Sequence, residues 1–253
     1  VIPLLSVLHN NLYKKSVLLY AKDEVLQTKI ESFNWGGRIN TTDRDYLNIT
    51  SVNLSGTKTD RSIEKDIDLV SEIAGNGSVV NTLTYTIKNP LPAQDGLHNT
   101  SFVRFFVPKG SKLLSSKGFS SVTLPSLDNE KYTHDFAVEN WERDLSQDQL
   151  SGMYIGTEAG KTIYGNWINV KGTESQTITL KYQLPFSIKK LDRYSLLFQK
   201  QPGSLPMKFQ YTINLGDRAI LWKNSIEGVE ENKSMKYLGK LETDTFFGLV
   251  TGK

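Results

Sequence analysis

From about Asp45 onward, apolar residues recur at every second position, and this alternation constrains the fold more than any other feature of the chain. The clearest runs lie at 83–87, where threonine and lysine occupy the opposite positions, and at 178–184. A period of two is typical of strands that bury one face. The pattern therefore predicts a mainly β protein built as an antiparallel β-sandwich.

Clusters of Gly, Asn, Asp and Pro interrupt the alternation about every ten residues and predict turns between short strands. One sandwich needs about 100 residues, so we expect the main sandwich at roughly 62–190 and further β structure on either side of it. The expected strands are 46–53, 63–72, 79–88, 101–107, 119–123, 132–138, 161–170, 176–183, 193–200, 208–214 and 246–251.

The first 45 residues have a helical period instead. Apolar residues at three- and four-residue spacing predict a helix after Pro3, and Asp23 can cap a second helix that ends before Gly36. A short strand is expected between them at 16–21. We therefore divide the chain into a helix–strand–helix segment at 1–45, which completes an upstream region, and an antiparallel sandwich region at 46–253 with a C-terminal β extension. Overall this is an α+β chain.

The composition excludes several classes of protein. The 253 residues contain no cysteine, which rules out disulfides, thiol nucleophiles and Cys-ligated zinc. The three histidines lie far apart in sequence, so we expect no metal site and no cofactor. Lys and Arg number 30 against 27 Asp and Glu, which gives a formal charge of 30 − 27 = +3. So small a net charge does not predict binding to nucleic acid.

No signal peptide or membrane-spanning run is present in the sequence, and the chain begins at Val1. We therefore expect it to be a piece of a longer protein.

Aromatic and acidic residues supply the candidate ligand contacts. The stretch 139–144 combines three acidic residues with a tryptophan in a predicted loop, a composition able to bind a sugar or a cation. Flat aromatic faces also provide much of the contact area in recognition sites, and Trp35 is flanked by glycine. The selected contacts are Trp35, Glu139, Trp141 and Glu142.

The other two tryptophans, Trp167 and Trp222, follow strand patterns and are interpreted as core or half-core residues.

An enzymatic alternative rests on carboxylates. Glycoside hydrolysis needs two Asp or Glu side chains about 5–9.5 Å apart across a cleft, and the pair Asp43 and Asp45 or the acids of 139–144 could supply them. Asp66 and Asp68 alternate with apolar residues, so we interpret them as a solvent-exposed strand face. No Gly-x-Ser-x-Gly nucleophile motif is present.

Several segments resemble, in their order, the C-terminal half of the bacterial family catalogued as domain of unknown function 4012. The resemblance runs from about residue 12 to 215. It includes Leu18-Leu19-Tyr20, Trp35-Gly36-Gly37-Arg38, Lys58-Thr59-Asp60-Arg61, Pro108-Lys109-Gly110-Ser111 and Gln199-Lys200-Gln201-Pro202-Gly203.

This resemblance implies a large extracytoplasmic region tethered by an N-terminal membrane helix that is not part of this chain. The expected function is a cell-envelope-anchored structural or interaction module that presents loops to an envelope glycan or a surface protein. The alternative is an envelope polysaccharide hydrolase or transferase that uses paired carboxylates. The sequence leaves the oligomeric state open.

The purified chain should bind no transition metal stoichiometrically, because it has no cysteine and its histidines are dispersed. Metal analysis of protein purified without a histidine tag measures this. One equivalent of tightly held zinc or iron would contradict the expectation.

Overall fold

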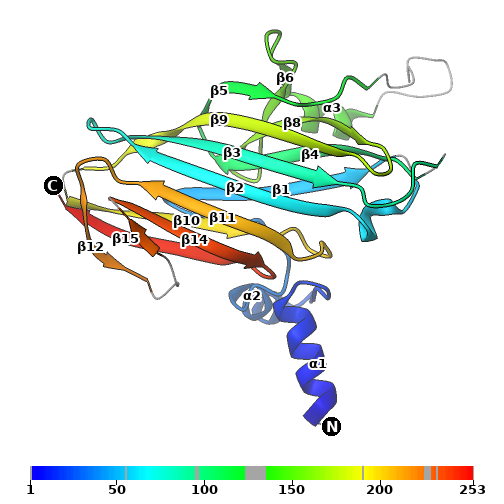
Figure 1. Ribbon diagram of the computed structural model, residues 1–253. Helices are drawn as coiled ribbons and strands as arrows, with labels where there is room; N and C mark the ends of the chain where they lie inside the picture. Colours follow the sequence, from blue (N-terminus) through cyan, green and yellow to red (C-terminus); the bar gives the residue numbers. More distant parts are fainter. Residues whose placement is uncertain are drawn as a thin grey trace.

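The computed structural model describes residues 2–54, 56–94, 97–122, 135–189, 191–224, 229–231 and 233–252. Strands dominate this part of the chain and form two sheets that face each other (Figure 1). The eight-stranded sheet has the order β12 (Ala219–Lys223), β15 (Thr245–Gly252), β10 (Leu191–Gln199), β1 (Asp45–Asn53), β4 (Asn99–Pro108), β8 (Lys161–Val170), β7 (Tyr154–Glu158), β6 (Ser146–Gln147).

The seven-stranded sheet covers one side of the first sheet. Its strand order is β13 (Val229–Glu231), β14 (Ser234–Leu241), β11 (Met207–Asn214), β2 (Glu64–Ile73), β3 (Ser78–Lys88), β9 (Ser175–Ser187), β5 (Lys112–Lys117).

Both sheets are mixed, so the expectation of purely antiparallel sheets is wrong. β1 runs parallel to β10, with Asp45 opposite Leu196, and β2 runs parallel to β11, with Ile67 opposite Phe209. The two halves of the chain follow related paths. In the first, β1 is followed by the β2–β3 hairpin of the other sheet, and β4 then returns antiparallel to β1. In the second, β10 is followed by β11, and after β12 and β13 the antiparallel partner β14 leads to β15, which returns antiparallel to β10.

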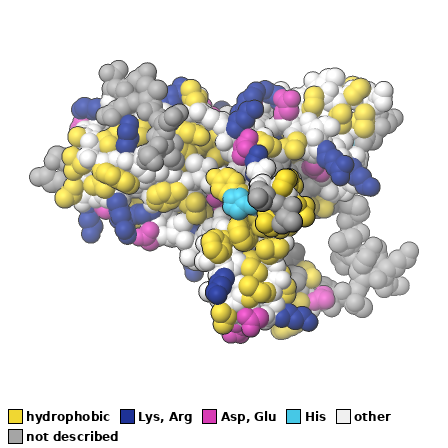
Figure 2. All heavy atoms as spheres, turned by 90° about the horizontal axis from the view of Figure 1, so that it is seen from below, with side chains coloured by type: hydrophobic (Ala, Val, Ile, Leu, Met, Phe, Trp, Pro, Cys, Tyr) yellow, Lys and Arg dark blue, Asp and Glu magenta, His cyan; other side chains and the backbone are white. Residues whose placement is uncertain are grey.

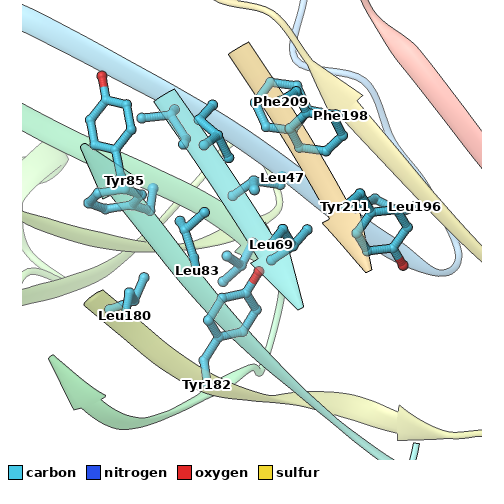
Figure 3. Packing of buried hydrophobic residues seen from close by; sticks show 14 of the residues in the cluster. Leu47, Leu69, Leu83, Tyr85, Leu180, Tyr182, Leu196, Phe198, Phe209 and Tyr211 are labelled. Carbon is cyan, nitrogen blue, oxygen red and sulfur yellow. The ribbon is translucent and has the colours of Figure 1, made fainter. Parts of the chain in front are cut away.

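One continuous core fills the space between the sheets. Leu47 and Phe198 enter it from the eight-stranded sheet, and Leu69, Leu83 and Tyr211 enter it from the seven-stranded sheet (Figure 3). Full burial of such side chains contributes about 1.5–3 kcal/mol each, and the regular alternation of buried and exposed positions along β3 is what allows it.

Most of the strands expected after residue 45 are confirmed to within a few residues, but two segments differ. Residues 119–122 are irregular, and residue 123 lies outside the described residues. The segment 132–138 belongs partly outside the described residues and partly to helix α3 (Phe136–Glu142), which Asp135 caps by accepting hydrogen bonds from the backbone of Ala137 and Val138. Strands β5, β6, β7, β12, β13 and β14 had no expected counterpart.

The two N-terminal helices are confirmed. They are α1 (Ile2–Tyr13) and α2 (Glu24–Ser32), and the side chain of Asp23 accepts a hydrogen bond from the backbone of Leu26 as the expected N-cap. The expected strand at 16–21 is wrong. No strand forms there; the Leu19 backbone donates to the Trp35 carbonyl just after α2, and the Ala21 backbone donates to the Gln27 side chain on α2 at 2.9 Å.

The N-terminal helices project from one end of the two sheets, and hydrophobic side chains gather on them (Figures 1 and 2). Leu12 and Ile30 are buried at the base, but much of the apolar surface faces solvent. The exposed set is Leu4, Leu5, Val7, Leu8, Tyr20, Val25, Leu26 and Phe33. Among the described residues, no helix has the length and hydropathy required to cross a membrane.

A buried charge pair fastens the base of this segment to the sheets. The carboxylate of Asp244 lies 2.7 Å from the Lys15 ammonium and accepts hydrogen bonds from the Asn34 amide at 2.6 Å and from the Lys200 backbone at 2.9 Å. The side chains of Lys15 and Asp244 are only 1% and 9% exposed. We call this arrangement the Asp244 junction.

Replacing Asp244 with alanine should release the N-terminal helices, because it leaves the Lys15 ammonium buried without its partner. Such breaks destabilise by about 3–5 kcal/mol. Hydrogen exchange of residues 2–35, together with thermal unfolding, measures the effect.

The matched control is Glu242→Ala. Glu242, two residues before Asp244, pairs with Lys14, but both side chains are well exposed. The loss of unfolding free energy should therefore stay below about 1 kcal/mol. Equal protection of residues 2–35 in both variants would contradict the role of the Asp244 junction.

Candidate ligand-binding face

The four contacts selected from the sequence do not form one site. Trp35 is half-buried and stacks on Phe33 with ring centroids 4.9 Å apart. Glu139 is exposed on α3, which Figure 1 places on the opposite side of the sheets from α2. Trp141 and Glu142 also lie on α3, which corrects the expected loop, but their side chains fall outside the described part of the structure.

Of the carboxylates considered for catalysis, the pair Asp43 and Asp45 is held apart. Asp43 is exposed and forms an ion pair with Arg193, whereas the side chain of Asp45 is completely buried. Asp66 pairs with Lys88 at 2.9 Å on the outer face of β2, as the strand alternation indicated. Among the described residues, no group of three or more acidic or histidine side chains is arranged to hold a metal ion.

Asp45 is the centre of a buried polar network that joins the two sheets. Its carboxylate accepts hydrogen bonds from the Tyr194 hydroxyl at 2.6 Å, the Asn81 amide at 2.8 Å and the Tyr46 backbone at 2.8 Å. Burial raises the pKa of Asp45 to about 6, against the opposing effect of these hydrogen bonds. Because the carboxyl has no exposed surface, it is not open to a substrate.

An exposed apolar patch lies on the outer face of the eight-stranded sheet, at the edge formed by β12, β15 and β10. Its large side chains are 50–67% exposed. The register places Leu191 beside Gly252, and Val250 between Arg193 and Trp222. We call this patch the aromatic face. Its members are Leu191, Leu221, Trp222, Phe246, Gly248, Val250 and Gly252.

Two glycines let the side chains of the aromatic face lie flat on the sheet. A methyl group added to Gly248 would meet the ring of Phe246 at 2.9 Å and that of Trp222 at 3.8 Å, so both rings reach over this residue. A methyl group on Gly252 would likewise meet Leu221 at 2.9 Å. The inner faces of the rings therefore pack on backbone, and their outer faces remain open to solvent.

Trp222 was interpreted from the sequence as a core or half-core residue, and this is wrong. Ile220 packs partly against the core, so simple alternation would place Trp222 inside as well. The pairing with β15 shifts between Ile220 and Trp222, and such a β-bulge turns the following side chains to the other face. Trp167, by contrast, is buried as expected.

A charged rim lies next to the aromatic face. Arg193 on β10 lies opposite Val250 on β15, and its guanidinium forms the ion pair with Asp43. Both side chains are about two-thirds exposed, at 66% and 69%. The face therefore combines apolar ring surface with hydrogen-bonding groups that water can reach.

No family model matches this chain, and no curated protein matches it. The resemblance to the domain of unknown function 4012 family therefore stays a prediction.

Among solved structures, the chain is similar to a Legionella pneumophila protein whose name suggests nutrient binding. The identity is 10% and the TM-score 0.43, over 83% of this chain and 71% of the other. It is also similar to an M1 zinc metallopeptidase of Deinococcus radiodurans, with 11% identity and a TM-score of 0.29 over 76% of this chain and 42% of that one. Likenesses this distant carry no argument about fold or function.

The raised pKa of Asp45 predicts a pH dependence of stability. The ordinary value is 3.8 and the folded value about 6, so the folded state keeps its proton to higher pH than the unfolded state. The unfolding free energy should therefore be highest below about pH 4 and fall by about 3 kcal/mol as the pH rises through 6. Urea unfolding between pH 4 and 7.5 measures this.

In the Asp45→Asn variant this component of the pH dependence should disappear. The control Asp43→Asn removes an exposed carboxylate and should keep the wild-type slope. Parallel pH profiles for the wild type and Asp45→Asn would show that Asp45 does not titrate as described.

Proposed function

We propose that this chain is a non-enzymatic binding module of an extracytoplasmic cell-envelope protein, and that its aromatic face binds an envelope glycan. In this proposal a membrane helix outside the chain tethers the module. The sequence resemblance supports the location, and the aromatic face supports the binding role.

The observation that carries the proposal is the exposure of Trp222 and Phe246 side by side. They are 55% and 50% exposed, although burying such rings is favourable. Exposed apolar patches of this kind mark sites of interaction. A pyranose ring presents flat C–H surfaces and peripheral hydroxyls, which match the two rings and the adjacent Arg193–Asp43 pair.

The enzymatic alternative receives less support from the geometry. Glycoside hydrolysis requires two carboxylates that face one substrate, but in the first candidate pair Asp43 lies in a surface ion pair and Asp45 lies in the core. Of the acids of 139–144, Glu139 is exposed on α3, and the side chain of Glu142 lies outside the described part of the structure. The raised pKa of Asp45 would suit a general acid only if the group lined a cleft.

Replacing Trp222 with alanine should weaken binding of the chain to purified envelope polysaccharide by roughly thirtyfold. Loss of a central aromatic anchor commonly costs about 2 kcal/mol, and each 1.4 kcal/mol is about tenfold in affinity. Affinity electrophoresis in gels that contain the polysaccharide measures the change. The melting temperature should stay close to that of the wild type, because the side chain is more exposed than buried.

Leu238→Ala is the matched control. Leu238 is 65% exposed on the seven-stranded sheet, away from the aromatic face, and its loss should leave binding unchanged. Wild-type binding by Trp222→Ala would remove the aromatic face from the proposal. Retention of an envelope protein, with no retention by polysaccharide, would assign the face to a protein partner instead.

A further inference from the structure

An opening between the two sheets lies where the chain crosses twice from one sheet to the other. Because β1 is parallel to β10 and β2 to β11, the connections 54–63 and 200–206 lie at the same end of the fold. We call the opening the crossover pocket. Its volume is about 310 Å³, and the residues that line it and matter here are Ser51, Asp60, Arg61, Lys65, Ser204 and Leu205.

Two segments that stood out in the sequence meet at this pocket. They are 58–61, which contributes Asp60 and Arg61, and 199–203, which contributes Gln201. The Gln201 amide accepts a hydrogen bond from the Ser51 backbone at 3.0 Å and donates one back at 3.2 Å, so it replaces a strand partner for β1. These contacts fix the wall of the crossover pocket.

Lys65 occupies a position on β2 whose side chain is directed toward the core. It falls in the same alternation as Ile63 and Ile67, both of which are buried in the core. The side chain is half-buried, and burial lowers the pKa of its ammonium. Among the described residues, no ion pair includes Lys65 or Arg61.

The charge around the crossover pocket is positive. Arg61 and Lys65 oppose the single carboxylate of Asp60, one oxygen of which accepts a hydrogen bond from Asn99 at 3.2 Å. The pKa of the Lys200 ammonium is lowered first by burial, then by the charge of Lys15, and also by the charge of Lys65. Lys200 therefore lies close enough to Lys65 to feel its charge. The two lining cations outweigh the single carboxylate, so the pocket favours an anionic ligand.

The remaining lining favours a small hydroxylated molecule. Ser204 donates its hydroxyl proton to the Gln201 carbonyl at 2.7 Å, so its oxygen can accept a further hydrogen bond. Asp60 is exposed at the rim and offers a second acceptor. Leu205, with Pro202 and Pro206, forms an apolar wall. The volume is at the lower end of the range of about 300–1,000 Å³ for ligand pockets, which fits one sugar unit.

We propose that the crossover pocket binds a small anionic sugar, with its carboxylate or phosphate between Lys65 and Arg61 and its hydroxyls on Asp60 and Ser204. A uronic acid and a sugar phosphate share this chemistry. The site uses none of the residues of the aromatic face.

Isothermal titration of the full chain with four probes tests this assignment. The probes are glucuronate, glucose 6-phosphate, neutral glucose and inorganic phosphate. At least one of the two sugar anions should bind at least tenfold more tightly than glucose and than inorganic phosphate. The preferred sugar anion identifies the carboxylate or the phosphate as the recognised group.

Lys65→Met keeps the length and apolar stem of the side chain and removes its charge. It should therefore lower the affinity for the preferred sugar anion at least tenfold. Its melting temperature should not fall, because burial disfavours the half-buried Lys65 ammonium more than the nearby Asp60 carboxylate favours it in the free protein. Arg61→Gln, at an exposed position, should also weaken binding. The control Lys208→Met removes an exposed lysine of β11 and should leave binding unchanged.

Three results would overturn the proposal. They are the absence of binding by both sugar anions, equal binding of inorganic phosphate and the sugar anions, and equal losses in Lys65→Met and Lys208→Met. Because Trp222→Ala leaves this pocket intact, a failure here is distinguishable from a failure of the aromatic face.

Discussion

The parallel pairing of β1 with β10 and of β2 with β11 determines most of what this molecule can present to a ligand. A parallel pair cannot be closed by a hairpin and needs a longer connection, and in this fold β1 and β10 are each followed by a strand of the other sheet. Both crossings therefore begin at the same end, and the crossover pocket lies between them. The same pairing sends β15 and β12 to the outer edge, where the aromatic face lies.

The buried network around Asp45 helps to explain why these pairs keep one register. Tyr194 on β10 and Asn81 on β3 both donate to one carboxylate at the start of β1, so the bonds connect the two sheets as well as two neighbouring strands. A shift of one residue would turn Asp45 outward and leave those donors without an acceptor. The Asp244 junction fastens the N-terminal helices to the end of β10 in a similar way.

The sequence allowed the strands to be predicted where burial is simple. β3 and β9 alternate without interruption, and both were located closely. The parallel pairs could not be predicted, because pairing between residues such as Asp45 and Leu196 leaves no local signal. Trp222 was misassigned because a single bulge reverses the alternation, and a bulge depends on the partner strand β15. The helix α3 was divided between an expected strand at 132–138 and an expected loop at 139–144, because its seven residues are too few to show a helical period.

The candidate sites were predicted less well than the fold, and for a related reason. Residue type directed attention to Trp35 and to the acids and tryptophan of 139–144, whereas Phe246 with Trp222, and Lys65 with Arg61, are brought together only by the tertiary structure. The two sites rest on different forces. Stacking on the aromatic face depends mainly on apolar burial, whereas attraction in the crossover pocket depends on charges that salt screens within about 10 Å at 0.1 M. Because Lys65 is half-buried, its attraction for an anion is screened less than that of a surface lysine. Lys65 therefore occupies an inward position of β2 at a cost to the stability of the fold, and binding of an anion would account for its presence there.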